Sequence, residues 1–176
     1  MIRKLLLPFC SFLLIVGCSS STTSGIHVYF AQGDDTNVWA DIYTGTLTPH
    51  STADVVGGGT SEDVLTESVT VEVTTDGYVH VTVQGTTISG IMDNSGAWAV
   101  LASIGELSSL ISEKNINRLD DAGCSMSKKV IKIEGPGKPH YLDTISGDVS
   151  GQMKCKRALL TNVTLSTSGT LLAQVN

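Results

Sequence analysis

The chain has 176 residues, with 11 Lys and Arg against 17 Asp and Glu, and a formal net charge of −6. Aromatic residues make up only 5% of it while glycines number 18, a composition that favours a glycine-punctuated β protein over a helical bundle. An acidic chain with few aromatic side chains for stacking is a poor binder of nucleic acid, so we expect no nucleic-acid partner.

Two basic residues and an apolar run lead up to the sequence Leu14-Ile15-Val16-Gly17-Cys18. The run has about 13 residues, fewer than the roughly 20 that a membrane-spanning helix needs. This segment resembles a bacterial lipoprotein signal peptide that ends in a lipobox. The resemblance implies cleavage before Cys18, a diacylglycerol on the Cys18 thiol and an acyl chain on the new amino group. An ordinary secretory signal cleaved near Gly17 is the alternative.

The same resemblance predicts the subcellular location of the protein and the division of the chain into segments. In that family a Ser after the cysteine, as at Ser19, favours sorting to the outer membrane rather than retention at the inner one. We expect a signal peptide over 1-17, an acylated flexible tether over 18-25 and a single disulfide-stapled β-rich domain over 26-176. The domain is expected to be periplasmic or surface-exposed, held on the membrane by its acyl chains.

Charge is distributed unevenly along the mature chain. Without Arg3 and Lys4 the chain keeps 9 basic residues against 17 acidic ones, a net charge of −8. No Lys or Arg stands between Cys18 and Glu113, where 12 residues are acidic. This asymmetry indicates either an interaction surface or two halves of the fold that complement each other.

The first part of the domain contains two strand candidates, at 26-31 and 38-47. Residues 50-67 include Gly57-Gly58-Gly59 and are expected to form a long loop. The next segment, 68-84, alternates valines with polar residues on both sides of Asp76-Gly77, which predicts a hairpin.

The number of residues in the loop decides which faces of the sheet the two rows of valines occupy. A two-residue loop would place the two rows of valines on opposite faces of the sheet. A three-residue loop, Thr75-Asp76-Gly77, instead pairs Val73 with Val79 and keeps one face apolar. We predict the three-residue loop, with Gly77 in the left-handed conformation.

The second part of the chain contains one helix among further strands. Ser103 and Glu106 form a capping-box pattern ahead of an apolar stripe, which predicts a helix at about residues 104-114. The remaining strand candidates are 86-92, 97-102, 129-134, 148-155, 159-165 and 170-175. The fold class is therefore mainly β, an antiparallel β-sandwich or half-open barrel with one short amphipathic helix.

Two cysteines remain after Cys10 leaves with the signal peptide and Cys18 becomes the anchor. An even pair in an oxidising compartment predicts a disulfide between Cys124 and Cys155. Closing a loop of this length stabilises a fold by roughly 3 to 4 kcal/mol in the chain-entropy model. Neither cysteine has a second ligand at the spacing of a zinc site.

No catalytic motif is complete. The Ser125-Met126-Ser127-Lys128 sequence fits the S-x-x-K pattern of penicillin-binding enzymes, but the partner motifs of that family are missing. The four histidines are far apart in sequence, so we expect no catalytic residues, no metal site and no cofactor other than the lipid on Cys18.

The expected disulfide defines one candidate interaction surface. It would bring together five basic side chains, which we call the basic patch: Lys128, Lys129, Lys154, Lys156 and Arg157. The alternative is that these side chains only neutralise the acidic half of the domain.

These features predict a non-enzymatic, membrane-anchored envelope lipoprotein that acts as a structural or protein-interaction module with an envelope protein partner. Two alternatives remain open. One is an inhibitor or effector of a hydrolase, which would insert a protruding loop. The other is a small-ligand carrier with an apolar β cavity.

Overall fold

The computed structural model of the protein describes residues 31–124, 130–135, 143–157 and 161–175. The expected strand at 26-31 lies almost wholly outside these residues. The elements, in chain order, are β1 (Asp41–Val55), β2 (Gly59–Val64), β3 (Glu67–Val73), β4 (Tyr78–Val83), β5 (Thr86–Met92), β6 (Trp98–Ser103), the 3-10 helix η1 (Ser108–Leu110), α1 (Glu113–Asp121), β7 (Val130–Gly135), β8 (Thr144–Arg157) and β9 (Thr161–Val175).

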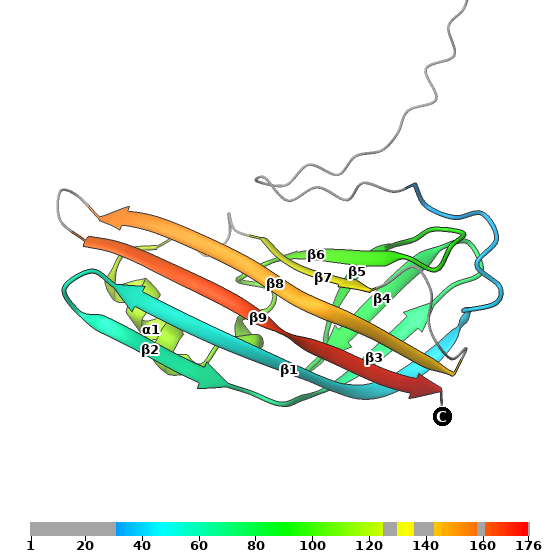
Figure 1. Cartoon of the computed structure of the whole chain (residues 1–176), viewed down its shortest axis with the longest axis horizontal. Helices are drawn as coiled ribbons and strands as arrows, with labels where there is room; N and C mark the ends of the chain where they lie inside the picture. The colour runs from blue at the N-terminus through cyan, green and yellow to red at the C-terminus, as the bar shows by residue number, and fades with distance from the viewer. Residues whose placement is uncertain (1–30, 125–129, 136–142, 158–160, 176) are drawn as a thin grey trace, which may run out of the picture.

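The strands form a closed antiparallel barrel (Figure 1). Strands β3 to β8 each pair with the next strand along the chain, and β1 pairs with β3 on one edge. The other edge of β1 pairs with β9, from Tyr43 opposite Val175 to Val55 opposite Val163, which closes eight strands into a barrel. The mainly β class is confirmed. The barrel is closed because β1, the first strand, pairs with β9, the last strand.

The expected long loop at 50-67 is wrong, because most of it is sheet. Residues 50–55 continue β1, and β2 pairs with them from Val64 opposite His50 to Gly59 opposite Val55. The glycines form a tight turn, with positive φ at Gly57 and Gly59. The inward positions of this hairpin include Ser51 and Ser61, both buried, so its alternation lacks the apolar signal that marks a strand.

The predicted hairpin register is confirmed. Val73 lies opposite Val79 and Val71 lies opposite Val81, which is the pairing of a three-residue loop. Gly77 adopts a φ of +80°, the left-handed conformation that this loop needs. All the valines of the two strands are buried on the barrel interior.

The boundaries expected for the helix are wrong. Ser103 and Glu106 do form a reciprocal capping interaction, since the Glu106 carboxylate accepts from the Ser103 N–H and the Ser103 hydroxyl accepts from the Glu106 N–H. That interaction closes a single turn, followed by η1, and α1 begins only at Glu113. The apolar residues of the expected helix fill the barrel end as a compact plug: Ile104, Leu107, Leu110 and Ile111.

A second cap starts the real helix. The Ser112 hydroxyl accepts from the Asn115 N–H, so α1 begins after Ser112. The buried Asn115 side chain donates to the backbone oxygen and the hydroxyl of Ser51, at 3.2 and 3.0 Å. Arg118 donates to the Gly59 carbonyl at 2.9 Å. These contacts fix α1 against the hairpin of β1 and β2.

The last two strands are longer than expected. Strand β8 begins at Thr144 rather than at 148, and β9 joins the two segments expected at 159-165 and 170-175. Small residues at 166–169 weaken the periodic signal, but their pairing with β8 and β1 on both edges keeps them in the sheet.

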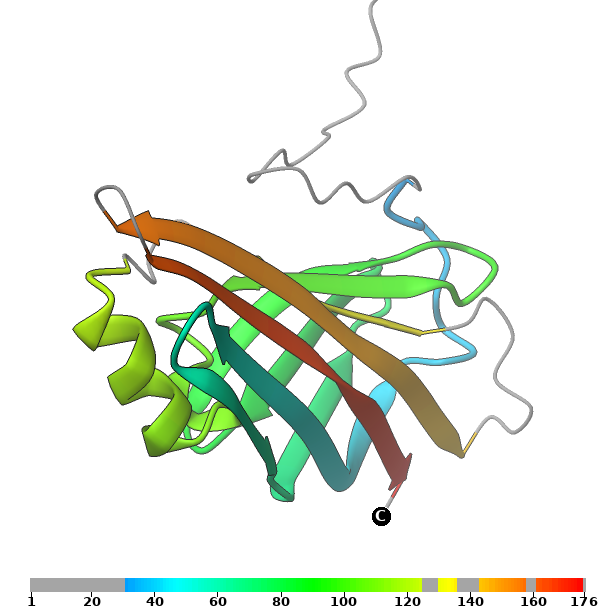
Figure 2. The same ribbon diagram turned by 60° about the vertical axis from the view of Figure 1, so that its left-hand side comes forward.

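Side chains fill the barrel interior. Strands from all around the wall contribute residues that are at most 1% exposed: Leu47, Val81, Val100, Ile133 and Met153. Helix α1 lies at one end of the barrel, and the C-terminal end of β9 lies at the other (Figures 1 and 2). We call this second end the mouth; β1, β4, β6 and β8 begin there.

Candidate functional site

Residues 31–40, which we call the strap, run along the mouth before β1 begins (Figure 1). The Gly33 N–H donates to the Met92 carbonyl at 2.7 Å. Thr36 is fully buried, and its hydroxyl donates to the Thr74 carbonyl at 2.7 Å. The strap is therefore tied to the ends of β3 and β5, and it carries the first aromatic side chain of the site.

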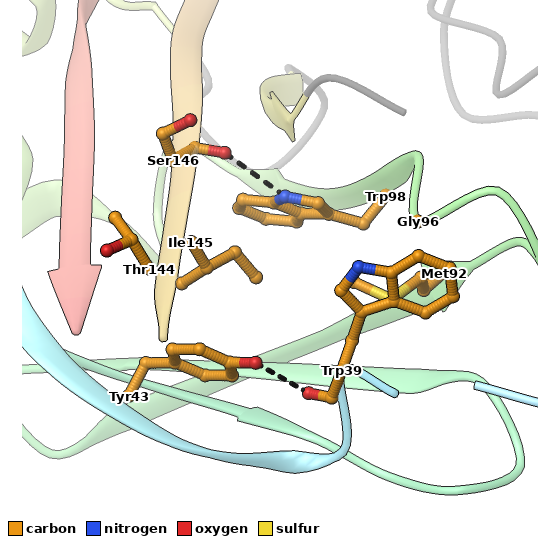
Figure 3. Close-up of a pocket in the computed structure, with 8 residues that line it drawn as sticks. All are labelled: Trp39, Tyr43, Met92, Gly96, Trp98, Thr144, Ile145 and Ser146. Carbon is orange, nitrogen blue, oxygen red and sulfur yellow. Dashed lines mark hydrogen bonds between the residues drawn. The ribbon is translucent and has the colours of Figure 1, made fainter. Parts of the chain in front are cut away.

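Three aromatic side chains line a cleft at the mouth (Figure 3). Trp39 comes from the strap, Tyr43 from β1 and Trp98 from the start of β6. The buried Trp98 ring donates its Nε1–H to the Ser146 carbonyl at 3.2 Å. The Tyr43 hydroxyl donates to the Trp39 carbonyl at 2.8 Å, which fixes the end of the strap against β1. The cleft is completed by Met92, Gly96, Thr144, Ile145 and Ser146.

Glycines make room for the two indole rings. A Cβ atom at Gly135 would overlap Nε1 of Trp98 and the Ser146 carbonyl, and one at Gly147 would stand 2.7 Å from Cζ2 of Trp98. A Cβ atom at Gly96 would stand 2.7 Å from Cε2 of Trp39. The positions of both rings therefore depend on backbone that carries no side chain.

One polar atom of the cleft is unsatisfied. Nε1 of Trp39 is buried and has no hydrogen-bond partner among the described residues. In Figure 3 this nitrogen lies on the edge of the ring that faces Trp98 and Ile145. Leaving a buried donor unpaired costs about 1–3 kcal/mol, so such groups in native structures normally meet a water or a ligand.

The size of the cleft limits what can enter. The enclosed part measures about 10 Å³, inside a cleft of about 260 Å³ that includes space open to solvent. The enclosed part holds roughly one water-sized group. The cleft is therefore too small to take a whole ligand, and most of a bound group would lie in its open part.

The mouth is surrounded by carboxylates, which we call the acidic rim: Asp34, Asp35, Asp41, Asp76, Asp93 and Asp143. They stand on the strap, at the start of β1, in the turns after β3 and β5, and before β8. No Lys or Arg stands among the described residues of this end. Burial raises the pKa of Tyr43, and the charges of Asp41 and Asp143 raise it further. The phenol consequently stays protonated at neutral pH and keeps donating to Trp39.

Exposed apolar side chains also gather at this end, and we call them the apolar rim: Val38, Ile42 and Tyr78. Their exposed fractions are 57%, 53% and 43%. Val38 belongs to the strap, Ile42 to the start of β1 and Tyr78 to the start of β4. Exposed apolar side chains with charged residues near them are typical of protein-interaction surfaces.

A second hollow, of about 580 Å³, lies on the outer wall of β7, β8 and β9. Glu134 on β7 lies directly opposite Asp148 on the neighbouring strand β8, and Lys132 forms an ion pair with Glu134. The hollow is shallow and contains no buried polar group without a partner among the described residues. It resembles an ordinary solvated face, so we place the candidate site at the mouth.

Of the residues predicted from the sequence, those that the structure describes lie away from the mouth. Cys124 follows α1 and Cys155 lies on β8, with their Cα atoms 5.9 Å apart, so the expected pair is at disulfide distance. This link joins the plugged end of the barrel to β8. Cys18, where the sequence predicts lipid attachment, lies outside the described residues.

The basic patch remains a prediction. Lys154 is described, and it is exposed on the outer face of β8. Lys128 and Lys129 lie outside the described residues, as do the side chains of Lys156 and Arg157. The structure therefore neither assembles the patch nor separates its members.

Sequence reasoning missed the aromatic cleft. The chain has only two tryptophans, and both lie at the mouth, next to the turns where strands begin. Their rarity and this shared position were the available signal. The hydrogen-bond state of Trp39 could not be read from sequence, because it depends on what the closing barrel places beside the ring.

No protein-family model matches the chain, and no curated protein shows significant similarity to its sequence. Within the described ranges, no three His, Cys, Asp or Glu side chains lie close enough together to bind a metal ion. None of the described helices is long and apolar enough to cross a membrane.

Proposed function

We propose that the protein is a non-enzymatic, membrane-anchored envelope lipoprotein whose barrel binds another envelope component through its mouth. The observation that carries the binding role is the unpaired Trp39 donor, in an aromatic cleft at the end of an otherwise filled barrel. The lipobox-like sequence ending at Cys18 supports the anchor.

The position of the strap links the two roles. Twelve residues separate Cys18 from Ala31, where the strap begins beside the mouth. A chain of that length spans at most about 40 Å and typically about 20 Å. An anchor on Cys18 would thus hold the mouth near the outer membrane, where envelope partners are available.

The carrier and inhibitor alternatives have less support. A carrier needs an interior cavity for an apolar ligand, commonly about 300–1,000 Å³, whereas the mouth encloses about 10 Å³. An inhibitor would be expected to insert a protruding loop into a hydrolase cleft. The loop expected at 50-67 is largely sheet, paired in β1 and β2.

Photo-crosslinking in intact cells tests the proposal. A photoreactive amino acid replaces Val38 at the mouth or, as the matched control, Val56 at the far end, which is similarly exposed at 61%. We expect a discrete crosslinked species from position 38 that is absent from position 56. Equal crosslinking from both ends, or none from position 38, would contradict binding through the mouth.

A further inference from the structure

The acidic rim, the apolar rim and the unpaired indole donor together describe a partner. We propose that the mouth binds a basic polypeptide segment, which places an apolar side chain against the apolar rim and a backbone carbonyl oxygen on Nε1 of Trp39. This inference rests on the proposed function and specifies the chemistry of its partner.

Charge complementarity favours a basic partner. All six residues of the acidic rim are aspartates, and the described residues of this end include no Lys or Arg to balance them. Such a concentration of charge attracts cationic partners and accelerates their association. It also disfavours the anionic phosphates of a lipid surface, even though the anchor would keep the mouth near one.

The carboxylates of the acidic rim differ in the number of hydrogen bonds that they accept from the rest of the fold. Asp93 accepts from the Ser95 and Ala97 N–H groups and from the Ser95 hydroxyl, so it holds the turn between β5 and β6. Asp41 accepts only from the N–H of its neighbour Ile42 in the hydrogen bonds described. Asp34 accepts from the Asn94 amide. Asp34 and Asp41 can therefore be neutralised as Asn with little change to the fold.

The apolar and hydrogen-bonding parts of the surface specify the rest of the partner. Val38 and Ile42 leave more than half of their area in water, which an apolar side chain would cover. The cleft that Trp39 lines has room for about one small group. A peptide carbonyl oxygen has the required size and acceptor character, and a polypeptide presents it within a few ångströms of an apolar side chain.

Peptide titration of the full-length protein in neutral detergent micelles tests this inference. The protein is labelled with ¹⁵N at its two tryptophans, and Trp39→Phe assigns the two indole N–H signals. The probe is acetyl-Lys-Leu-Val-Lys-amide. Its controls are acetyl-Glu-Leu-Val-Glu-amide, with reversed charge, and acetyl-Lys-Ser-Ser-Lys-amide, without apolar side chains.

We expect the Lys-Leu-Val-Lys peptide to move the Trp39 indole proton downfield in a saturable way, and the Trp98 proton much less, since Trp98 already donates to Ser146. Trp39→Phe should weaken binding about threefold or more, the loss of one hydrogen bond. Asp34→Asn with Asp41→Asn should weaken it about threefold to tenfold, and 0.5 M salt should act in the same direction. Asp54→Asn, at the far end of β1, should leave binding unchanged.

Several results would overturn the inference. One is equal binding of the charge-reversed peptide or of the serine peptide. Another is a Trp39 signal that does not respond to the Lys-Leu-Val-Lys peptide, as when a tightly held water already occupies the donor. A shift caused by anionic phosphatidylglycerol vesicles alone would assign the mouth to lipid. A shift that depends on protein concentration would assign it to a second copy. If position 38 still crosslinks in cells, these results remove the basic partner and leave the proposed function standing.

Discussion

Replacing Gly135 with Ala should destabilise the barrel through Trp98. The added methyl group would overlap Nε1 of Trp98 and the Ser146 carbonyl, which are themselves hydrogen-bonded. Forcing one carbon into a packed interior costs about 1–3 kcal/mol. Displacing the ring also leaves its buried donor unpaired, at about 1–3 kcal/mol more. We therefore expect a loss of about 2–6 kcal/mol in the free energy of unfolding.

Urea denaturation measures this loss. With a slope of about 1–3 kcal/mol per molar, the unfolding midpoint should fall by about 2 M for a mid-range loss of 4 kcal/mol. Gly105→Ala is the matched control, since a Cβ atom there meets nothing nearer than the Ser103 hydroxyl, at 3.9 Å. That variant should stay within about 1 kcal/mol of the parent protein.

A double-mutant cycle identifies the cause. In the Trp98→Phe background the smaller ring lacks Nε1, so adding Gly135→Ala should cost less than it does in the parent protein. Equal midpoints for the Gly135→Ala and Gly105→Ala variants would refute the packing argument. Strictly additive effects of the changes at 98 and 135 would refute the assignment to this ring.

Three further predictions concern the disulfide, the turn after β6 and the basic patch. Mass analysis without reductant should show Cys124 joined to Cys155, and Cys155→Ala should lower stability by roughly 3 to 4 kcal/mol; free thiols in the oxidised protein would contradict this. Hydrogen bonds from Ser103 lower the pKa of Glu106 below its ordinary value of 4.5. The ionised carboxylate therefore stabilises the fold fully above pH 4.5, and this stabilisation disappears as the pH falls through the lowered pKa. Glu106→Gln should accordingly unfold more easily than the parent protein at pH 7 and equally easily at about pH 2, and a difference that persists in acid would contradict the sign. Reversing Lys154 and Lys156 to Glu should leave the melting temperature unchanged and weaken salt-sensitive partner capture if the patch binds; a lower melting temperature with intact capture would assign these lysines to structure.

Strong local patterns allowed part of the fold to be predicted. The alternating valines around Gly77 fixed both a hairpin and its register, because a slip by one residue would expose a whole apolar row. The strand expected at 86-92 has the bounds of β5. In these segments the local signal and the buried face agree.

The predictions failed where tertiary contacts decide the local structure. Residues 50–64 form sheet although their inward side includes Ser51 and Ser61, because α1 covers that side and Asn115 hydrogen-bonds to Ser51. The capping pattern at Ser103 is real, but the apolar residues after it fill the barrel end instead of extending a helix.

The candidate site was hidden for the same reason. Trp39 and Trp98 are 59 positions apart, and they meet only when β1 and β6 are placed at the same end of a closed barrel. The cysteine pair was easier to predict, since export with loss of Cys10 and lipidation of Cys18 would leave two cysteines and a single pairing. The proposed anchor was predicted from a local sequence motif alone, without reference to the fold.

Intact mass measurement of the protein purified from membranes tests the central claim most directly, because the proposed lipidation at Cys18 would place the barrel on the envelope membrane. We predict a chain that begins at Cys18 and carries the added mass of a diacylglycerol and one further acyl group, all of it lost in Cys18→Ala. A chain that begins at another residue, or one that begins at Cys18 without lipid, would contradict the account.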